Sequence, residues 1–393
     1  AGAGPLLATL IGRRLAAASA DERAALELAA VLGRAFDHKR WAAAAAAPGV
    51  AALPRLIAGR FLERTEHGYQ FRHDLIREQV YTALSPERRR ALHAQALALF
   101  ERDGAAARCA WHAQQAELWP QAARWYRLAG EQAHASYAYA AARQLLDEAL
   151  ACARRAAPDA AALLAVHRAR LRTLALTGPL SALRAESAVV EQLATATGSD
   201  AARLDALEAR VGVESLDTQP AQLQETIGTA LALAEALADR STAARLHRIY
   251  GLHLLLTSAA RPDEGVRHLE RAVELAERAG DYQALVAALC ARGFGQRLLG
   301  QSAAAHASAS QALALAEVRP ELYPARADAL RVLAEVALNR GEWELARATL
   351  RNAIGLLEEL QDRWPLAFAY FMATSVGYAM GQHAEARAFA GRL

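Results

Sequence analysis

The segments Gly300-Gln301-Ser302-Ala303-Ala304-Ala305 and Gly341-Glu342-Trp343-Glu344-Leu345-Ala346 decide the fold, because they carry one pattern 41 residues apart. A third copy runs from Gly381 to Ala386. In each copy a glycine, which adopts a left-handed turn at little cost, is followed five positions later by alanine. Counting back in the same steps places earlier turns at Tyr137, Gly178, Gln219 and Ala260. These steps of 40 or 41 residues predict a repeat in which each unit is a pair of helices.

Small residues recur at fixed distances from these turns. Five positions after a turn stand Ala142, Gly265, Ala305, Ala346 and Ala386. Twelve positions after a turn stand Ala149, Ala272, Ala312 and Ala353, and seven before a turn stand Gly130, Gly212 and Gly293. Positions seven apart share one face of a helix, so these residues predict where paired helices cross closely.

The pattern of helix, turn, helix and small crossing residues resembles the tetratricopeptide repeat. That repeat has about 34 residues, so a period of about 41 lengthens each helix by roughly one turn. The longer repeat is similar to those in the sensor regions of large bacterial transcription activators. The resemblance covers roughly residues 104–393. It implies an all-α fold, a right-handed superhelical solenoid of helix pairs over residues 102–393.

Composition supports stacked helices and excludes several classes of function. Hydrophobic residues make up 54% of the 393 residues, many of them alanine, whereas aromatic residues make up only 6%. Alanine favours helices, and strands favour β-branched and aromatic residues. The net charge of +3 indicates no overall field for nucleic acid or a membrane surface. No apolar run is long enough to span a bilayer.

Motifs for catalysis and metal binding are absent from the sequence. The only lysine, Lys39, stands outside any Gly-Lys-Ser/Thr motif, so the chain has no P-loop. It also lacks GxSxG and HExxH motifs. Cys109, Cys152 and Cys290 form no CxxC pair, which is typical of a reducing cytoplasm. We therefore expect a cytoplasmic protein that is not an enzyme and holds no metal and no cofactor of its own.

The first hundred residues follow another pattern. Helices are expected at Asp21–Gly33, Lys39–Ala46 and Ala51–Gly59. Alternating apolar and polar residues over Phe61–Arg72, on both sides of a glycine-bearing turn, predict a β-hairpin. Three helices followed by a hairpin indicate a small winged-helix domain over residues 19–101, with residues 1–18 as a linker from an upstream module.

The segment Phe71-Arg72-His73-Asp74, with the helix that follows it, resembles the winged-helix segment of bacterial signal-transduction ATPases with numerous domains. Leu28–Phe36 and Leu84–His93 match the same family, which is often found beside LuxR-type or SARP-type regulators. The resemblance implies an upstream ATPase module that binds ATP or ADP, and a sensor of tetratricopeptide repeats downstream. It also implies that His73 contacts the nucleotide in the ADP-bound resting state of the full-length protein.

By the same resemblance Arg72 and Asp74 support that histidine. The alternative is that His73 and Asp74 only begin a helix, where polar and acidic residues are favoured anyway. Winged helices also bind DNA, and three arginines lie on or just after the expected recognition helix, namely Arg55, Arg60 and Arg64. The apolar residues on that helix and the glutamates that follow favour a structural role, so we expect no direct contact with nucleic acid.

In related repeats the first helix of each pair lines the concave side, and residues ten and six before each turn face it. Here those positions hold Arg127, Glu131, Tyr250, Leu254, Cys290, Phe294, Arg331, Glu335, Phe371 and Ser375. Charged and aromatic side chains there are suited to an effector small molecule, a peptide or a protein. The alternative for any one of them is an ordinary solvated surface residue.

The sequence thus predicts a sensor and scaffold region of a signal-transduction ATPase-type transcriptional regulator, which relays binding to a nucleotide switch. Two alternatives stay open: a plain adaptor for protein partners, and an accessory region of a nucleotide cyclase. Self-association is a further possibility. The chain lacks an initiator methionine and ends within a helical pattern, so we expect a piece of a larger protein.

Overall fold

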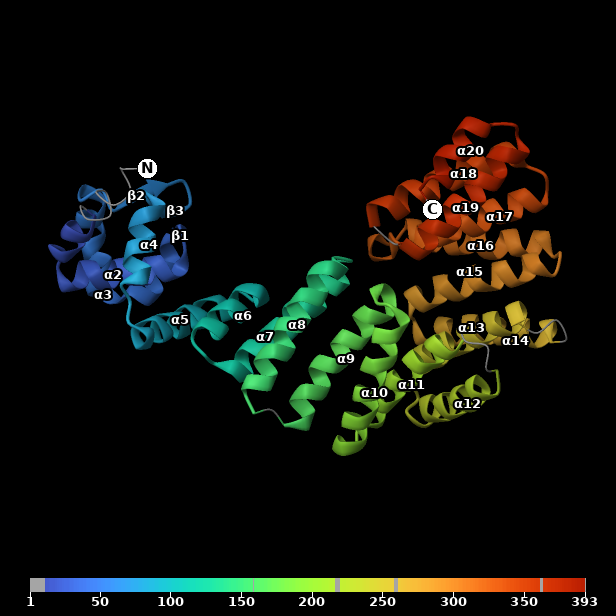
Figure 1. The fold of residues 1–393 in the computed structure, drawn as a ribbon, viewed down its shortest axis with the longest axis horizontal. Helices are drawn as coiled ribbons and strands as arrows, with labels where there is room; N and C mark the ends of the chain where they lie inside the picture. The colour runs from blue at the N-terminus through green and yellow to red at the C-terminus, as the bar shows by residue number, and fades with distance from the viewer. Residues whose placement is uncertain (1–10, 158, 216–219, 258–260, 361–362, 393) are drawn as a thin grey trace. The chain divides into compact units, whose positions relative to one another are not determined.

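The computed structural model describes residues 11–157, 159–215, 220–257, 261–360 and 363–392. Contacts divide the chain into two compact units, unit 1 over Ala1–Arg170 and unit 2 over Leu171–Leu393. Both consist mainly of helices joined by short turns (Figure 1). None of the helices in the described part of the chain is both long enough and apolar enough to cross a membrane.

Unit 1 begins with a small mixed region. Its elements are α2 (Ala20–Leu32), β1 (Ala35–Asp37), α3 (His38–Ala58), β2 (Leu62–Thr65), β3 (Gly68–Phe71), α4 (Asp74–Thr82) and α5 (Pro86–Glu101). The strands form an antiparallel sheet in the order β1-β3-β2. Ser19 caps α2 through a capping box with Glu22, in which each side chain accepts a hydrogen bond from the other residue's backbone N–H. The expected hairpin is confirmed as β2–β3.

One expectation for this region was wrong, and one element was not predicted. The helices predicted at 39–46 and 51–59 are one helix, α3, which continues through Pro48 and Pro54. The sheet also has a third strand, β1, beyond the expected hairpin. The Trp41 side chain at the start of α3 is fully buried, and its Nε1 donates a hydrogen bond to the Ala25 carbonyl oxygen of α2 at 3.3 Å. Leu53 and Leu56, which follow Pro48, are buried in the same core as Trp41, and this packing outweighs the local preference of proline for a helix break.

The rest of unit 1 contains the first helix pairs, namely α6 (Ala106–Gln115), α7 (Trp119–Ala135) and α8 (Tyr139–Arg155), and the start of α9 (Ala160–Thr177). Unit 2 continues with α10 (Leu180–Thr197), α11 (Asp200–Glu214), α12 (Pro220–Ala236), α13 (Arg240–Thr257), α14 (Pro262–Ala279), α15 (Tyr282–Leu298) and α16 (Ser302–Glu317). It ends with the short 3-10 helix η1 (Pro320–Leu322), α17 (Ala325–Asn339), α18 (Trp343–Leu360), α19 (Arg363–Ala379) and α20 (His383–Ala390). The all-α solenoid of helix pairs is thereby confirmed.

Most of the predicted turns lie where the period places them. Tyr137, Gly300, Gly341 and Gly381 have φ values of 60°, 75°, 75° and 72°, and each separates the two helices of a pair. Gly178 lies between α9 and α10 without a positive φ, because it is followed by Pro179, the extended N-cap residue of α10. Gln219 and Ala260 lie outside the described residues. The turns from one pair to the next were not predicted; they hold Glu117, Ala157, Gly198, Ala238 and Gly280, all with positive φ.

The predicted small residues mark real helix crossings. All of the alanines five and twelve positions after a turn are buried, and each is 0% exposed: Ala142, Ala149, Ala272, Ala305, Ala312, Ala346, Ala353 and Ala386. A Cβ added to Gly130 would lie 2.6 Å from the Leu146 Cγ, and one on Gly293 would lie 3.1 Å from the Ala305 oxygen. Gly212 is an exception, since a Cβ there meets nothing within 4 Å. The prediction of a crossing at Gly212 was therefore wrong.

The first helices of successive pairs in unit 2 contact one another: α11 with α13, α13 with α15, α15 with α17 and α17 with α19. We call these five helices the first-helix layer. Each also packs on the second helix of its own pair, so one side of the layer is covered by the second helices. The layer brings together side chains that are about 40 residues apart in the sequence.

Candidate functional site

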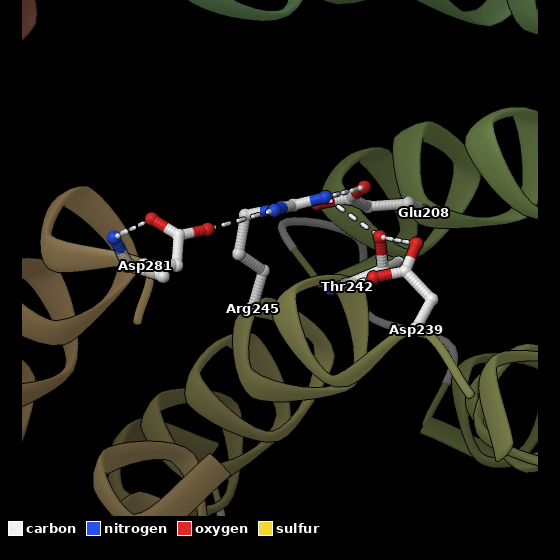
Figure 2. A network of polar contacts seen from close by, with 6 residues as sticks. Glu208, Asp239, Thr242, Arg245 and Asp281 are labelled. Atoms are coloured by element: carbon white, nitrogen blue, oxygen red, sulfur yellow. Dashed lines mark hydrogen bonds and ion pairs between the residues drawn. The ribbon is translucent and has the colours of Figure 1, made fainter. Parts of the chain in front are cut away.

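Arg245 of α13 is the centre of a polar network in the first-helix layer (Figure 2). Its guanidinium donates two hydrogen bonds to the Glu208 carboxylate of α11, Nε to Oε1 at 2.5 Å and Nη2 to Oε2 at 3.0 Å. Nη2 also donates to Thr242 Oγ1 at 2.7 Å. Burial alone would lower the pKa of Arg245, but the hydrogen bonds and charge of Glu208 outweigh it and raise that pKa. This two-pronged pair fixes α11 against α13.

Two aspartates complete the network from the starts of helices (Figure 2). Asp281, the N-cap residue of α15, accepts a hydrogen bond from the Ala284 N–H at 2.9 Å, and its Oδ2 lies 3.7 Å from Arg245 Nη1. Asp239 accepts hydrogen bonds from the Thr242 N–H and hydroxyl at 2.9 and 2.8 Å. Backbone N–H groups at a helix start stabilise such carboxylates. The charge of Arg245 is therefore matched, and its role is to join helices.

Arg248 lies one turn after Arg245 on the same helix, but its environment differs. Among the described residues it forms no hydrogen bond and no ion pair, and its Nε is buried without a partner. The residue as a whole is half-buried. Burial lowers the pKa of Arg248, and the charges of Asp328 and Glu208 only partly oppose this effect. A buried donor without an acceptor destabilises a fold, so its presence in a folded chain calls for a reason.

A second group of charges joins α15 to α17. Glu335 of α17 is 4% exposed and lies between two guanidinium groups. Arg331 of the same helix donates a hydrogen bond to it, and Arg297 Nε of α15 lies 2.8 Å from its Oε2 without hydrogen-bond geometry. Burial raises the pKa of Glu335 in spite of both arginines. With Asp328 3.6 Å from Arg331, two arginines face two carboxylates, and this group is balanced.

Cys290 of α15 lies among these charges. The residue is 5% exposed, and Asp328, Arg331 and Arg248 all act on its thiol electrostatically. Burial raises the pKa of the Cys290 thiol far above its usual range. A thiol that stays protonated is a poor nucleophile and a poor metal ligand. Cys290 is therefore a small buried packing residue.

Exposed aromatic rings continue the layer on α19. Phe368 and Phe371 are 42% and 58% exposed, and their ring centroids lie 6.4 Å apart. The Arg331 guanidinium carbon lies 5.5 Å from the Phe368 ring centroid, a cation–π contact between α17 and α19. The layer thus presents charged groups on α13 and α17 and an apolar surface beside them. Interfaces that bind peptides and proteins combine arginine and aromatic anchors in this way.

The positions predicted to face the concave side have varied surroundings. Tyr250 and Leu254 are buried, because the face of α13 that carries them packs on α14, the second helix of the same pair. The Tyr250 ring lies edge-on to His268 of α14, with ring centroids 4.9 Å apart. Phe294 is half-buried beneath Arg297. Arg127 and Glu131 form an ion pair at 2.7 Å on α7 of unit 1, and Ser375 is exposed on α19. Arg331, Glu335 and Cys290 come together in the second group of charges.

The residues that sequence reasoning missed are Glu208, Arg245, Arg248 and Arg297. A signal for two of them was present, because Arg245 and Arg248 are three residues apart on a first helix and so share a face. Arg245 is paired and Arg248 is unpaired, but this difference cannot be read from the neighbouring sequence. It depends on residues of other helices, such as Glu208, which is 37 residues from Arg245.

The residues expected to contact nucleotide lie at the start of α4 in unit 1. His73 is the N-cap residue, but its side chain makes no capping hydrogen bond. Arg72, His73 and Asp74 are exposed, and Asp74 Oδ2 lies 3.2 Å from Arg34 Nη1. Capping therefore does not account for the His73 side chain, which is free to contact another surface.

Other candidates in the described part of the chain are weaker. No group of three or more His, Cys, Asp or Glu residues there is placed to hold a metal ion. A cavity of about 560 Å³ lies beside the turn before α18, lined by Gly341, Glu342, Trp343, Glu344, Leu345, Ala379 and Met380. None of these lining residues is a buried polar side chain, so the hollow offers no preorganised contact.

No family model matches the chain, and no curated protein matches it in sequence. Among solved structures, the chain is similar to a Signal Transduction ATPase with Numerous Domains from Pyrococcus horikoshii that has a tetratricopeptide repeat sensor. The identity is 12% and the TM-score 0.48, and the match covers 98% of this chain. The chain spans 64% of that protein's length.

A second similar structure is a Rap protein complexed with Competence and Sporulation Factor. The identity is 12% and the TM-score 0.51, and the match covers 69% of this chain and 75% of the Rap chain. At this identity the likeness concerns the fold alone. It supports the helical-repeat architecture described above.

Proposed function

We propose that the chain is a protein-interaction scaffold that binds a peptide or protein segment on the first-helix layer of unit 2. The observation that carries the proposal is the presence, within one layer of first helices, of an unpaired arginine and exposed phenylalanines. Arg248 lacks a partner among the described residues, and Phe371 is 58% exposed. The Rap protein of the same fold was solved with a bound factor, which is consistent with this use of the architecture.

The chain itself is proposed to be non-catalytic. Its three cysteines are buried, and burial raises the pKa of Cys109 and Cys152 to about 11. Such thiols are protonated at neutral pH and do not attack substrates readily. Free buried thiols are also the usual state in a reducing compartment, in agreement with a cytoplasmic protein.

The test of the binding proposal is a selection of random displayed peptides on the purified chain. Enriched peptides are then resynthesised, and their affinities are measured by fluorescence polarisation. We expect dissociation constants of about 10 µM or tighter, corresponding to a binding free energy of roughly −7 kcal/mol. The substitution Phe371→Ala should weaken binding, because it removes an exposed aromatic anchor of the layer.

Leu345→Ala is the matched control. Leu345 is 55% exposed, close to the value for Phe371, but it lies on α18, the second helix of its pair. Binding should survive this change. If no peptide is enriched, or if Phe371→Ala and Leu345→Ala have equal effects, binding on the first-helix layer is refuted.

A finer proposal follows from the resemblance to signal-transduction ATPases. In it, unit 2 senses an effector, and the exposed His73, Arg72 and Asp74 contact nucleotide on an ATPase module outside this chain, within a transcriptional regulator. The plain adaptor and the cyclase accessory region are the alternatives. The observation in favour of the switch is that His73 heads α4 with no capping bond to occupy its side chain.

The switch is tested in the full-length gene product. If that product carries a P-loop ATPase module, His73→Ala should raise its basal output, because a contact that holds the resting state is lost. Glu78→Ala, an exposed change on the same helix, is the control. A product without an ATPase module, or equal output from wild type and His73→Ala, leaves the adaptor as the better description. A cyclase domain in the product would favour the third alternative.

A further inference from the structure

Two groups of ion pairs in the first-helix layer are balanced, and Arg248 belongs to neither. Arg245 is satisfied by Glu208, with Asp281 beside it. Arg297 and Arg331 face Glu335 and Asp328. Asp239 and Asp281 accept hydrogen bonds from the N-termini of α13 and α15. Arg248 differs from these arginines, because its Nε is buried without a hydrogen bond and no carboxylate of the described residues lies within ion-pair distance of it.

The place of Arg248 suits a ligand contact more than a structural one. It lies on α13, next to the paired Arg245, and the charges that act on it come from α11, α15 and α17. Its Nε is buried, which restricts the side chain, while the residue as a whole stays partly accessible to solvent. A fork of donors kept in position before binding loses little entropy when an acceptor arrives.

We infer that Arg248 receives a carboxylate of the bound peptide, so that the scaffold selects acidic ligands. The inference rests on the proposed function and specifies the ligand chemistry of the same layer. Carboxylates and guanidinium groups pair in a planar, two-pronged geometry, which gives both energy and direction to the contact. The carboxylate has two possible sources in a peptide, an Asp or Glu side chain or the C-terminus, and both present the same acceptor to Arg248.

The exposed rings of Phe368 and Phe371 extend the argument to the rest of the ligand. They lie on α19, reached from α13 through the intervening first helices, and Arg331 contacts Phe368. A ligand that reaches both Arg248 and these rings must be extended over several helices, as a peptide segment is. An apolar residue at a distance from the acidic group is therefore part of the expected pattern.

The experiment uses an array of synthetic peptides made in three matched forms. One form has free acidic side chains and a free C-terminus, one has Asp and Glu replaced by Asn and Gln, and one has a C-terminal amide. Wild-type chain, Arg248→Gln and Arg267→Gln are applied to the same array. Arg267 is exposed on α14, a second helix, so it controls for the loss of one positive charge.

We expect the wild type and Arg267→Gln to bind the same acidic peptides, and Arg248→Gln to bind them at least about tenfold more weakly. Loss of binding in the Asn/Gln form assigns the side-chain carboxylate, and loss in the amide form assigns the C-terminus. If wild type binds peptides and Arg248→Gln binds the same set equally well, this inference is wrong while the proposed function stands. If the wild-type chain binds no peptide on the array, both this inference and the proposed function are refuted.

Thermal unfolding separates a ligand contact from a structural one. Arg248→Gln should leave the melting temperature unchanged or raise it, because a desolvated charge without a partner is removed. Arg245→Gln should lower it, because Glu208 then loses both hydrogen bonds. A melting temperature for Arg248→Gln that falls as far as that of Arg245→Gln would show that Arg248 holds the fold, and would overturn the inference.

Discussion

The sheet-bearing part of unit 1 and the repeats of unit 2 are both largely helical, yet different residues stabilise them. The first has a core of large side chains such as Trp41, Phe71 and Leu56, which are at most 1% exposed. The second is packed at its crossings by alanines such as Ala305 and Ala312, each fully buried. Large side chains tie distant segments into one core, whereas small ones let neighbouring helices approach. The elements of the first region therefore share one core, whereas the repeats are held by contacts between neighbouring helices.

The largest effect is expected for Trp41→Ala in unit 1. The change removes a fully buried indole and leaves the hydrogen bond to the Ala25 carbonyl unmade. We expect a loss of about 3–5 kcal/mol in the free energy of unfolding. Hydrogen exchange followed by mass spectrometry should show faster exchange in α2, α3 and the sheet together, because these elements share one core.

Leu246→Ala in unit 2 is the comparison for that result. Leu246 is also fully buried, in a cluster formed by α11, α12 and α13. Its loss should cost about 2–5 kcal/mol locally, with faster exchange confined to these and the adjoining helices. If faster exchange spread as widely through unit 2 after Leu246→Ala as through the sheet-bearing region of unit 1 after Trp41→Ala, unit 2 would also have one shared core. The contrast drawn between the two units would then be wrong.

A smaller effect is expected where two helices of unit 2 touch through glycine. A Cβ at Gly251 of α13 would lie 2.7 Å from the Gly265 carbonyl oxygen of α14, and backbone cannot move aside easily. Gly251→Ala should therefore destabilise unit 2 by about 1–3 kcal/mol. Gly228→Ala is the control: it lies in α12 with nothing within 4 Å of an added methyl group, and should stabilise by roughly 0.5–1 kcal/mol. Urea unfolding measures both, and the same sign for both would contradict the assigned crossing.

The repeat could be predicted from the sequence, because turns and helix crossings depend on residue types at nearby positions in the chain. Gly300, Gly341 and Gly381 adopt positive φ, and a small residue five positions later meets the partner helix. The single helix α3 could not be foreseen, since side chains on both sides of Pro48, namely Trp41, Leu53 and Leu56, are buried in one core. Local propensity and tertiary packing disagree there, and packing prevails.

The candidate site was foreseen only in part. Counting from the turns found Arg331 and Glu335, but it also selected Tyr250, which faces α14. Register alone cannot say how far each helix is rotated about its axis, and a rotation of one residue moves a side chain by about 100°. The contrast between Arg245 and Arg248 depends on Glu208 in another repeat, so only the folded structure reveals it.

The last comparison concerns histidine pairs, one in each unit. In unit 1, His93 and His112 are buried and joined Nδ1 to Nδ1 at 3.0 Å, and His93 Nε2 is hydrogen-bonded to Tyr81 Oη at 2.9 Å. Burial, then Arg89, lowers the pKa of His93 to about 4, and burial, then His93 and Arg108, lowers the pKa of His112 to about 3. The pair is therefore neutral in the folded state at pH 7.

In unit 2, His247 and His268 are joined Nδ1 to Nδ1 at 2.7 Å but are only half-buried. Burial, then His268 and Arg271, lowers the pKa of His247 to about 4. Burial also lowers the pKa of His268, although Glu264 opposes it. Solvent can reach this pair, so opening it to accept a proton disturbs less of the surrounding structure.

Because the folded pKa values lie below the unfolded value of about 6.5, protonation favours the unfolded chain. The stability of unit 1 should be complete above pH 6.5 and fall as the pH drops toward 4, by about 2 kcal/mol for each of the two histidines at pH 5. Denaturant unfolding between pH 7.5 and 5 measures this, with hydrogen exchange to separate the units. Replacing both His93 and His112 with Gln should flatten the slope of unit 1 and leave that of unit 2 unchanged. A slope of unit 1 that survives the double substitution would assign its acid sensitivity to groups other than this buried histidine pair.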